Sequence, residues 1–114
     1  MVKRETGVPR PRRSTDYVLA FGTRDAEKGW RDVVATQRNA VVDAWDRLTA
    51  RPLDEDPRCH RLRGELAHVV RDGTSHEQRQ YELTGGARIW FYVEAKTKRV
   101  VLVRVFTAHP SQTK

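Results

Sequence analysis

The sequence has little cysteine and no long apolar run, and both absences narrow the classes of protein to which it can belong. Cys59 is the single cysteine among 114 residues, which excludes an intramolecular disulfide and a CxxC metal pair. No stretch approaches the roughly 18 apolar residues of a membrane-spanning helix, and the basic amino terminus lacks the apolar core of a signal peptide. We therefore expect a cytoplasmic protein that does not enter a membrane.

Positively charged residues are in excess over negatively charged ones. Lysine and arginine number 22 against 15 aspartates and glutamates, which gives a formal charge of +7 and an isoelectric point near 10.2. A basic surface attracts nucleic acid, an anionic membrane or an acidic protein, and charge alone does not choose among these partners. The length fits a single domain with a modest core.

Residues 1–15 are rich in arginine and proline and contain almost no large apolar side chains. Such a segment cannot bury enough surface to offset the entropy of ordering it. We expect a disordered basic tail followed by one domain over residues 16–114. The alternative is an arm that adds contacts to phosphate groups.

The rest of the chain predicts an α+β fold. A β-rich run at residues 17–21 precedes a helical pattern over residues 25–48, which polar residues 36–39 interrupt, so it is either one long helix or two. Pro52 closes it. Strand patterns follow at residues 78–83, 87–94 and 99–107, the first two joined by Thr84-Gly85-Gly86. We expect the helices to cover one face of a mostly antiparallel four-stranded sheet and to leave the other face open.

Alternation along the last two strands assigns side chains to the two faces. In residues 88–93 one set is apolar (Ile89, Phe91, Val93) and the other combines a guanidinium with two aromatic rings (Arg88, Trp90, Tyr92). We expect the second set to face outward, where it can pair with a phosphate and stack on a base. The alternative is an arginine at a strand end beside two core aromatics. In the last strand we expect Val101, Val103 and Val105 in the core, and Leu102, Arg104 and Phe106 opposite.

These elements and motifs resemble the RelE/ParE superfamily of type II toxins, and the RelE/YoeB-like branch most. The resemblance rests on Leu62-Arg63-Gly64-Glu65-Leu66 and on the hairpin from Tyr81 to Val93, and it covers roughly residues 16–114. It implies the toxin of a toxin–antitoxin system that cleaves messenger RNA on the ribosome. The implied partners are a cognate antitoxin, the ribosome and messenger RNA.

The resemblance also implies roles for individual residues. Arg88 matches the arginine that contacts the scissile phosphate, His109 lies near a carboxyl-terminal general acid, and His60 stands where the branch places a general base. The implied RNA-binding residues are Arg61, Arg63, Arg79, Tyr81, Trp90, Tyr92, Arg104 and Lys114. This sequence departs from the family in having histidine, not glutamate, at the base position. It also lacks the tyrosine that often lies near the carboxyl terminus of nuclease members.

The chemistry of this set is consistent with an endoribonuclease that uses no metal and no cofactor. Cleavage needs a base for the 2′-hydroxyl, cations at the phosphorane and an acid for the leaving 5′-oxygen. Histidine suits both proton roles, and arginines near His60 would disfavour its charged form. Cys59 and His60 are adjacent without a third ligand at fixed spacing, so we expect no zinc site. Two other functions remain open: a DNA gyrase inhibitor of the ParE type, and a non-catalytic RNA-binding module on the same fold.

Overall fold

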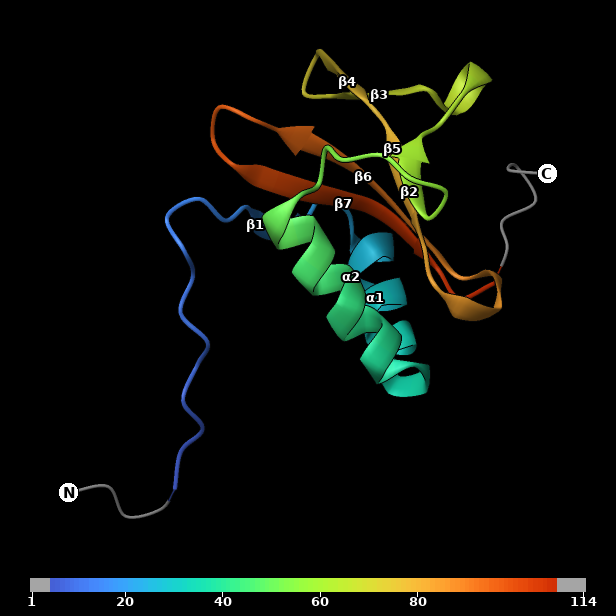
Figure 1. Cartoon of the computed structure of the whole chain (residues 1–114). Coiled ribbons are helices and arrows are strands. Elements are labelled where there is room, and N and C mark those ends of the chain that lie inside the picture. Colours follow the sequence, from blue (N-terminus) through green and yellow to red (C-terminus); the bar gives the residue numbers. More distant parts are fainter. Residues whose placement is uncertain (1–4, 109–114) are drawn as a thin grey trace.

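The computed structural model describes residues 5–108, which form two helices, seven strands and two short 3₁₀ turns (Figure 1). Residues 5–15 contain no helix or strand and lie at the surface. No helix within the described range is long and apolar enough to cross a membrane. The elements in chain order are β1 (Val18–Phe21), α1 (Arg24–Thr36), α2 (Arg38–Ala50), β2 (Cys59–Arg61), η1 (Gly64–Leu66), β3 (His68–Arg71), β4 (Thr74–Glu77), β5 (Arg79–Glu82), η2 (Thr84–Gly86), β6 (Arg88–Glu94) and β7 (Arg99–Phe106).

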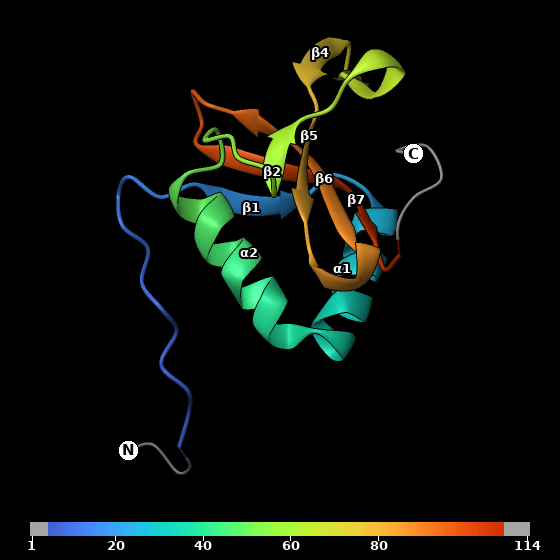
Figure 2. The same cartoon turned by 45° about the vertical axis from the view of Figure 1, so that its right-hand side comes forward.

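The main sheet has the strand order β1-β7-β6-β5-β2, in which only β1 and β7 run parallel. The predicted α+β class, with helices on one face of a mostly antiparallel sheet, is therefore confirmed. The sheet has five strands where the sequence predicted four, because the short strand β2 pairs with β5. A separate hairpin of β3 and β4 lies on the side of the sheet away from the helices (Figures 1 and 2).

The helical segment is two helices that meet at Gln37. The Thr23 hydroxyl caps α1 by accepting a hydrogen bond from the N–H of Ala26 at 3.0 Å. The Gln37 N–H closes α1 by donating to the carbonyl of Val33. The Gln37 side chain accepts hydrogen bonds from the N–H and hydroxyl of Thr84, the latter at 2.7 Å. These hydrogen bonds connect the junction of α1 and α2 to η2, the turn between β5 and β6.

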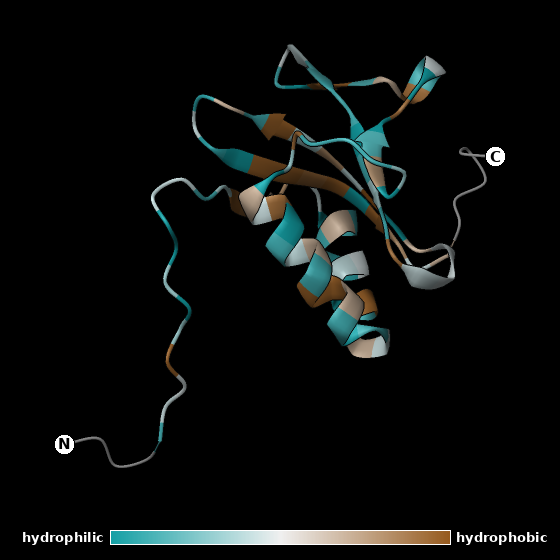
Figure 3. Ribbon diagram, viewed as in Figure 1, coloured by the Kyte–Doolittle hydropathy of each residue, from teal (hydrophilic) through white to brown (hydrophobic). Residues whose placement is uncertain are grey.

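The main core lies between the helices and the sheet. Its largest fully buried side chains include Phe91, Leu48, Ile89 and Leu102, and the apolar colouring of β6 and β7 in Figure 3 follows this layer. Helix α1 packs directly on β7. At Gly29 the approach is so close that a Cβ atom would lie 2.1 Å from the carbonyl oxygen of Val105.

The face assignment in β7 was right for Arg104, Val105 and Phe106 and wrong for the three residues before them, because the strand is irregular. Trp90 pairs with Arg104 but Phe91 pairs with Leu102, so Val103 is an extra residue in β7. Such a bulge shifts the alternation by one residue. Leu102 therefore joins Val105 in the helix-side core, whereas Val101 and Val103 pack on the opposite face.

The face away from the helices is less open than the sequence predicted. Val69 of β3 packs against Tyr92, Val101 and Val103. The ring of His76 in β4 stacks on Tyr92, with centroids 4.0 Å apart and an interplanar angle of 17°. Tyr92 is consequently only 6% exposed. The β3–β4 hairpin thus covers the part of this face nearest Tyr92. The prediction that the Tyr92 ring faces solvent is wrong.

The loop between α2 and β2 is held by a charge-assisted contact that should depend on pH. Arg47 donates to Asp56 at 2.6 Å, and this bond, with the backbone N–H groups of Arg58 and Cys59, lowers the pKa of Asp56. A lowered carboxylate pKa adds stability above the pKa of the unfolded chain, near 3.9, and the gain is lost as the pH falls through the folded value.

We therefore expect Asp56→Asn to lower the thermal midpoint at pH 7, and we expect the difference from the wild type to shrink below about pH 4. Asparagine keeps one oxygen as the acceptor for the N–H groups of Arg58 and Cys59, and it removes both the charge and the oxygen that accepts from Arg47. Thermal melts from pH 7 to pH 3 test this, with Asp32→Asn, an exposed α1 substitution, as the control. A difference that stays constant with pH would contradict the assignment.

Candidate functional site

The candidate site lies on the sheet face that turns away from the helices. Residues paired across neighbouring strands project to the same face. His60 pairs with Gln80, and Gln80 pairs with Trp90, which pairs with Arg104. In the next row Glu82 pairs with Arg88, and Arg88 with Phe106. We call these seven residues the far face: His60, Gln80, Glu82, Arg88, Trp90, Arg104 and Phe106.

Arg88 is the most buried cation of the far face, at 8% exposure. Its Nη1 donates to the carbonyl of Ala87 at 3.1 Å, and its Nη2 lies 3.7 Å from Oε1 of Glu82. The Nε atom is buried and has no hydrogen-bond partner among the described residues. Arginine cannot lose its charge in a protein, and a buried donor without a partner costs about 1–3 kcal/mol. An anion placed here would satisfy a donor that residues 5–108 leave without a partner.

Glu82 is the nearest carboxylate to Arg88, and its side chain is 43% exposed. The separation of 3.7 Å exceeds a normal hydrogen-bond length. Arg88 was expected to face solvent, and the structure instead places it beneath the surface beside this half-exposed carboxylate. A phosphate that approaches Arg88 must therefore displace Glu82 or share the guanidinium with it.

Trp90 occupies the far face but is 3% exposed. Its Nε1 donates to Oε1 of Gln80 at 3.0 Å, and Phe106 packs edge-on against it at 4.7 Å between centroids. The guanidinium of Arg104 lies over the Phe106 ring at 4.7 Å. Trp90 is therefore a buried packing residue of the site. The accessible cation and aromatic ring of this part of the far face are the exposed Arg104 and the half-buried Phe106.

His60 is half-buried at the edge of the far face. Its Nδ1 lies 3.0 Å from the carbonyl oxygen of Arg61. A carbonyl oxygen only accepts, so Nδ1 carries a hydrogen, and in the neutral ring Nε2 is left as the acceptor. That tautomer is the one a general base needs.

Two hollows of about 440 and 430 Å³ adjoin His60. Both are lined by His60, Arg61, Leu62 and Arg63, and the first also by His68. Arg63 is exposed, and within residues 5–108 it forms no ion pair. The 3₁₀ turn η1, which opens at Gly64 with a positive φ of 64°, follows Arg63.

The other predicted arginines near His60 are engaged by carboxylates. Arg61 pairs with Glu55 at 2.9 Å and with Glu77 at 3.6 Å. Arg79, which is only 9% exposed, pairs with the same two carboxylates at 3.2 and 2.8 Å. Arg79 is thus locked in an ion-pair network, which corrects its placement on an RNA-binding surface.

Tyr81 was also predicted to bind RNA, but the structure buries its side chain. It pairs with Cys59 and Ile89, which face the helices, and it is 4% exposed within the helix-side core. Burial raises the pKa of the Tyr81 hydroxyl. The β5–β6 register pairs Arg79 with Phe91 and Tyr81 with Ile89, so the odd-numbered residues of β5 lie on the helix side of the sheet.

The structure brings Arg88 and His60 to the same face, with β5 between their strands. Ideal strand and residue spacings would separate their Cα atoms by roughly 12 Å, so both side chains can reach one dinucleotide. His109 and Lys114 lie outside the described residues. Sequence reasoning did not include Phe106 or Gln80 in the site; the partnership of Gln80 with Trp90 follows only once the β5–β6 register is known. No group of three metal-ligating side chains lies within the described part of the chain.

Comparison with known proteins identifies the fold. No protein-family model and no curated protein sequence matches this chain. A chain of the RelBE2 toxin–antitoxin complex from Mycobacterium tuberculosis is similar in structure, with a TM-score of 0.59 and 22% identity over 86% of this chain and 98% of that one.

Two further solved structures are similar. A chain of the RelE–RelB complex from Pyrococcus horikoshii gives a TM-score of 0.55 and 15% identity, with 83% and 97% of the two chains covered. A metal-bound toxin from Helicobacter pylori gives 0.56 and 15%, with 79% and 92% covered. This chain therefore has the RelE-like toxin fold along nearly the full length of each of these chains, and the structural resemblance predicted from its motifs is confirmed.

Proposed function

We propose that this chain, a basic protein with the RelE-like fold, is the cytoplasmic toxin of a type II toxin–antitoxin system and cleaves messenger RNA on the ribosome. The observation that carries the proposal is the buried Arg88 guanidinium, whose Nε donor has no hydrogen-bond partner among residues 5–108. It lies on the same sheet face as a histidine whose Nδ1 contact leaves Nε2 as an acceptor. The cognate antitoxin, the ribosome and messenger RNA are the proposed partners.

In the proposed reaction, Nε2 of His60 takes the proton of a ribose 2′-hydroxyl. The 2′-oxygen then forms a bond to phosphorus, and the bond from phosphorus to the 5′-oxygen breaks. Arg88 stabilises the negative charge that grows on the non-bridging oxygens. A general acid protonates the departing 5′-oxygen, and we propose His109 for that role. Arg63 and Arg104 would bind neighbouring phosphates, and Phe106 would stack on a base.

A non-catalytic RNA-binding module is the second candidate, and the burial of Arg88 beside Glu82 favours it. If Glu82 holds the guanidinium permanently, the far face binds RNA through its exposed arginines and does no chemistry. The two functions differ in one measurable property, since only the first cuts the messenger.

The test is messenger integrity in a reconstituted translation reaction, mapped by primer extension. We expect the wild type to cut ribosome-bound messenger, and His60→Ala to cut it about 100-fold more slowly or worse, because a positioned base contributes 10²–10⁴-fold. His68→Ala is the matched control, because His68 lines the same hollow without a proposed role, and it should cut normally.

Three results would count against the proposal. Wild-type cleavage by His60→Ala would remove the base assignment. Intact messenger together with salt-sensitive RNA binding would favour the non-catalytic module. Intact messenger together with inhibition of supercoiling by purified gyrase would favour a ParE-type inhibitor.

A further inference from the structure

Glu82 of the far face lies between two arginines. On one side it pairs with Arg88 of β6. On the other side its N–H donates to the carbonyl of Arg58 at 2.7 Å, which continues the antiparallel register of Cys59 with Tyr81. Arg58 precedes β2 and is exposed. Because residues paired across neighbouring strands project to the same face, Arg58 extends the row of Glu82 and Arg88 by one position.

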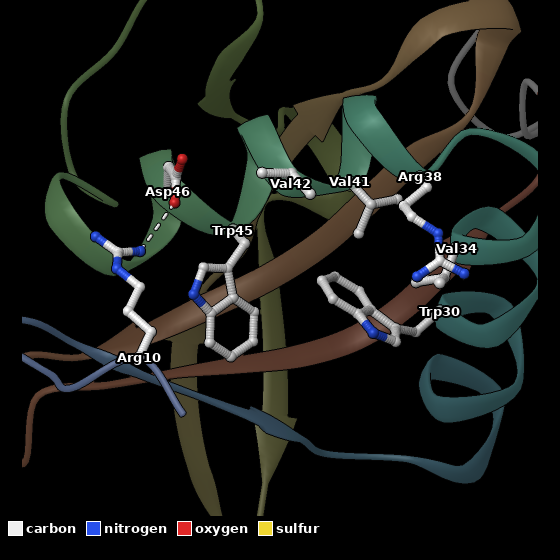
Figure 4. Close-up of a pocket in the computed structure, with 8 residues that line it drawn as sticks. All are labelled: Arg10, Trp30, Val34, Arg38, Val41, Val42, Trp45 and Asp46. Carbon is white, nitrogen blue, oxygen red and sulfur yellow. Dashed lines mark hydrogen bonds and ion pairs between the residues drawn. The ribbon is translucent and has the colours of Figure 1, made fainter. Parts of the chain in front are cut away.

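The Glu82 carboxylate pairs with only one of these two arginines. Its Oε1 lies 3.7 Å from Nη2 of Arg88. Nη1 of Arg58 donates instead to the main-chain carbonyl of Glu82 at 3.4 Å, and Arg58 forms no ion pair within residues 5–108. Figure 4 shows the opposite arrangement on the helix side of the sheet, where Arg10 directs its guanidinium at the carboxylate of Asp46, 3.1 Å away. Arg58 is therefore a cation beside a carboxylate that pairs elsewhere.

A hollow of about 420 Å³ gives the Glu82 side chain room to move. Its lining includes Arg58, Glu82 and the turn from Leu83 to Gly86. The Glu82 side chain is 43% exposed, so packing does not hold it in one position. Cβ atoms paired across neighbouring strands lie about 5 Å apart, and a side chain of this length has several staggered rotamers. A change of rotamer can therefore turn the carboxylate from Arg88 toward Arg58.

A phosphate at Arg88 supplies the reason for such a change. It would bring a second anion next to the Glu82 carboxylate, and like charges in a partly buried site repel each other strongly. Arg58 offers the carboxylate another cation on the side away from Arg88.

We propose that Glu82 is a displaceable plug on Arg88, and that Arg58 is the positioning residue that receives the Glu82 carboxylate when a phosphate binds. The inference rests on the proposed function for the phosphate at Arg88 and does not require cleavage. It also provides the route by which a buried guanidinium beside a carboxylate becomes available to RNA.

A double-mutant cycle on the full chain tests the inference. The probe is a fluorescein-labelled 2′-O-methyl RNA hexamer, which lacks the 2′-hydroxyl needed for cleavage, and binding is followed by anisotropy. Glu82→Gln should bind about three- to fivefold more tightly than the wild type, because the amide carries no charge that competes for Arg88. Arg58→Ala should bind about three- to fivefold more weakly, because the displaced carboxylate has lost its partner. An exposed ion pair supports effects of this size.

The decisive measurement is the double variant. In the Glu82→Gln background Arg58→Ala should leave the affinity unchanged, because no carboxylate has to be received. Arg58→Lys keeps a cation at the same position and should bind like the wild type. Lys96→Ala is the matched control: it removes an exposed cation from the turn between β6 and β7, at the other end of that hairpin from Arg88, and it should weaken binding less than Arg58→Ala does.

An Arg58→Ala defect of equal size in both backgrounds would assign Arg58 to direct contact with RNA and overturn the inference. Equal affinities of Glu82→Gln and the wild type would overturn it as well, as would a crystal structure with the hexamer in which Glu82 still pairs with Arg88. A folded Arg88→Ala that binds the hexamer like the wild type would instead show that no phosphate occupies Arg88, and the proposed function would then fail together with the inference.

Discussion

Arg88→Ala is expected to slow messenger cleavage by about 100-fold or more, because one preorganised donor at a developing oxyanion is worth 10²–10³-fold. The Ala87 carbonyl holds the guanidinium in place before any substrate binds, and the phosphate displaces Glu82 or shares the guanidinium with it. Arg88→Lys keeps the charge but loses the planar fork of donors, and we expect it to recover only part of the rate. Cleavage is measured by primer extension after a fixed translation time.

The matched control is Arg99→Ala, which removes an exposed arginine of β7 that pairs with Glu94 at the other end of the same hairpin. It should cleave normally. Because Arg88 is buried, the circular dichroism and thermal midpoint of each variant are recorded beside its activity. A folded Arg88→Ala that cuts messenger at the wild-type rate would mean that Arg88 serves only to pack against Glu82.

Gly29→Ala should destabilise the domain by about 3 kcal/mol or more, at the upper end of overpacking effects. In an ordinary helix the same change would stabilise, because glycine costs about 1 kcal/mol relative to alanine. Here the added Cβ would meet the Val105 carbonyl at 2.1 Å, and backbone atoms of a central strand cannot move aside as a side chain can. Helix α1 must therefore lift from β7.

Chemical denaturation measures the free energy of unfolding of this variant. Gly7→Ala is the control, since no atom lies within 4 Å of a Cβ built at Gly7, and its stability should match the wild type. An unchanged midpoint for Gly29→Ala would show that α1 does not approach β7 as closely as described.

Much of the fold could be predicted because its strong elements have regular patterns. The helical spacing of Trp30, Val33 and Val41 and the strand patterns of β6 and β7 are long enough to identify. The β3–β4 hairpin was missed because its strands, His68–Arg71 and Thr74–Glu77, have few apolar residues. It packs through Val69 and His76 onto a sheet that follows later in the chain, and no local pattern contains that contact.

The candidate site was harder to predict than the fold. The side of the sheet for Arg88 was predicted, but its burial was not, because burial depends on Glu82 and Phe106 from two other strands. Arg79 and Tyr81 were taken from the family resemblance as RNA-binding residues, and the pairing of β5 with β6 places them opposite Phe91 and Ile89 of the helix-side core. The extra residue at Val103 reversed the assignment of Val101, Leu102 and Val103, and a bulge cannot be seen in alternation counted from the sequence.

The pairing of the first strand with the last has a consequence for biosynthesis. Val18 in β1 lies beside Arg99 in β7, and the two strands are the only parallel pair in the sheet. A ribosome must therefore translate past residue 99 before β1 has a neighbour, and such distant pairings form slowly. The sheet of the nascent chain stays incomplete until β7 has been synthesised. Any activity that needs the folded protein therefore begins only after that point.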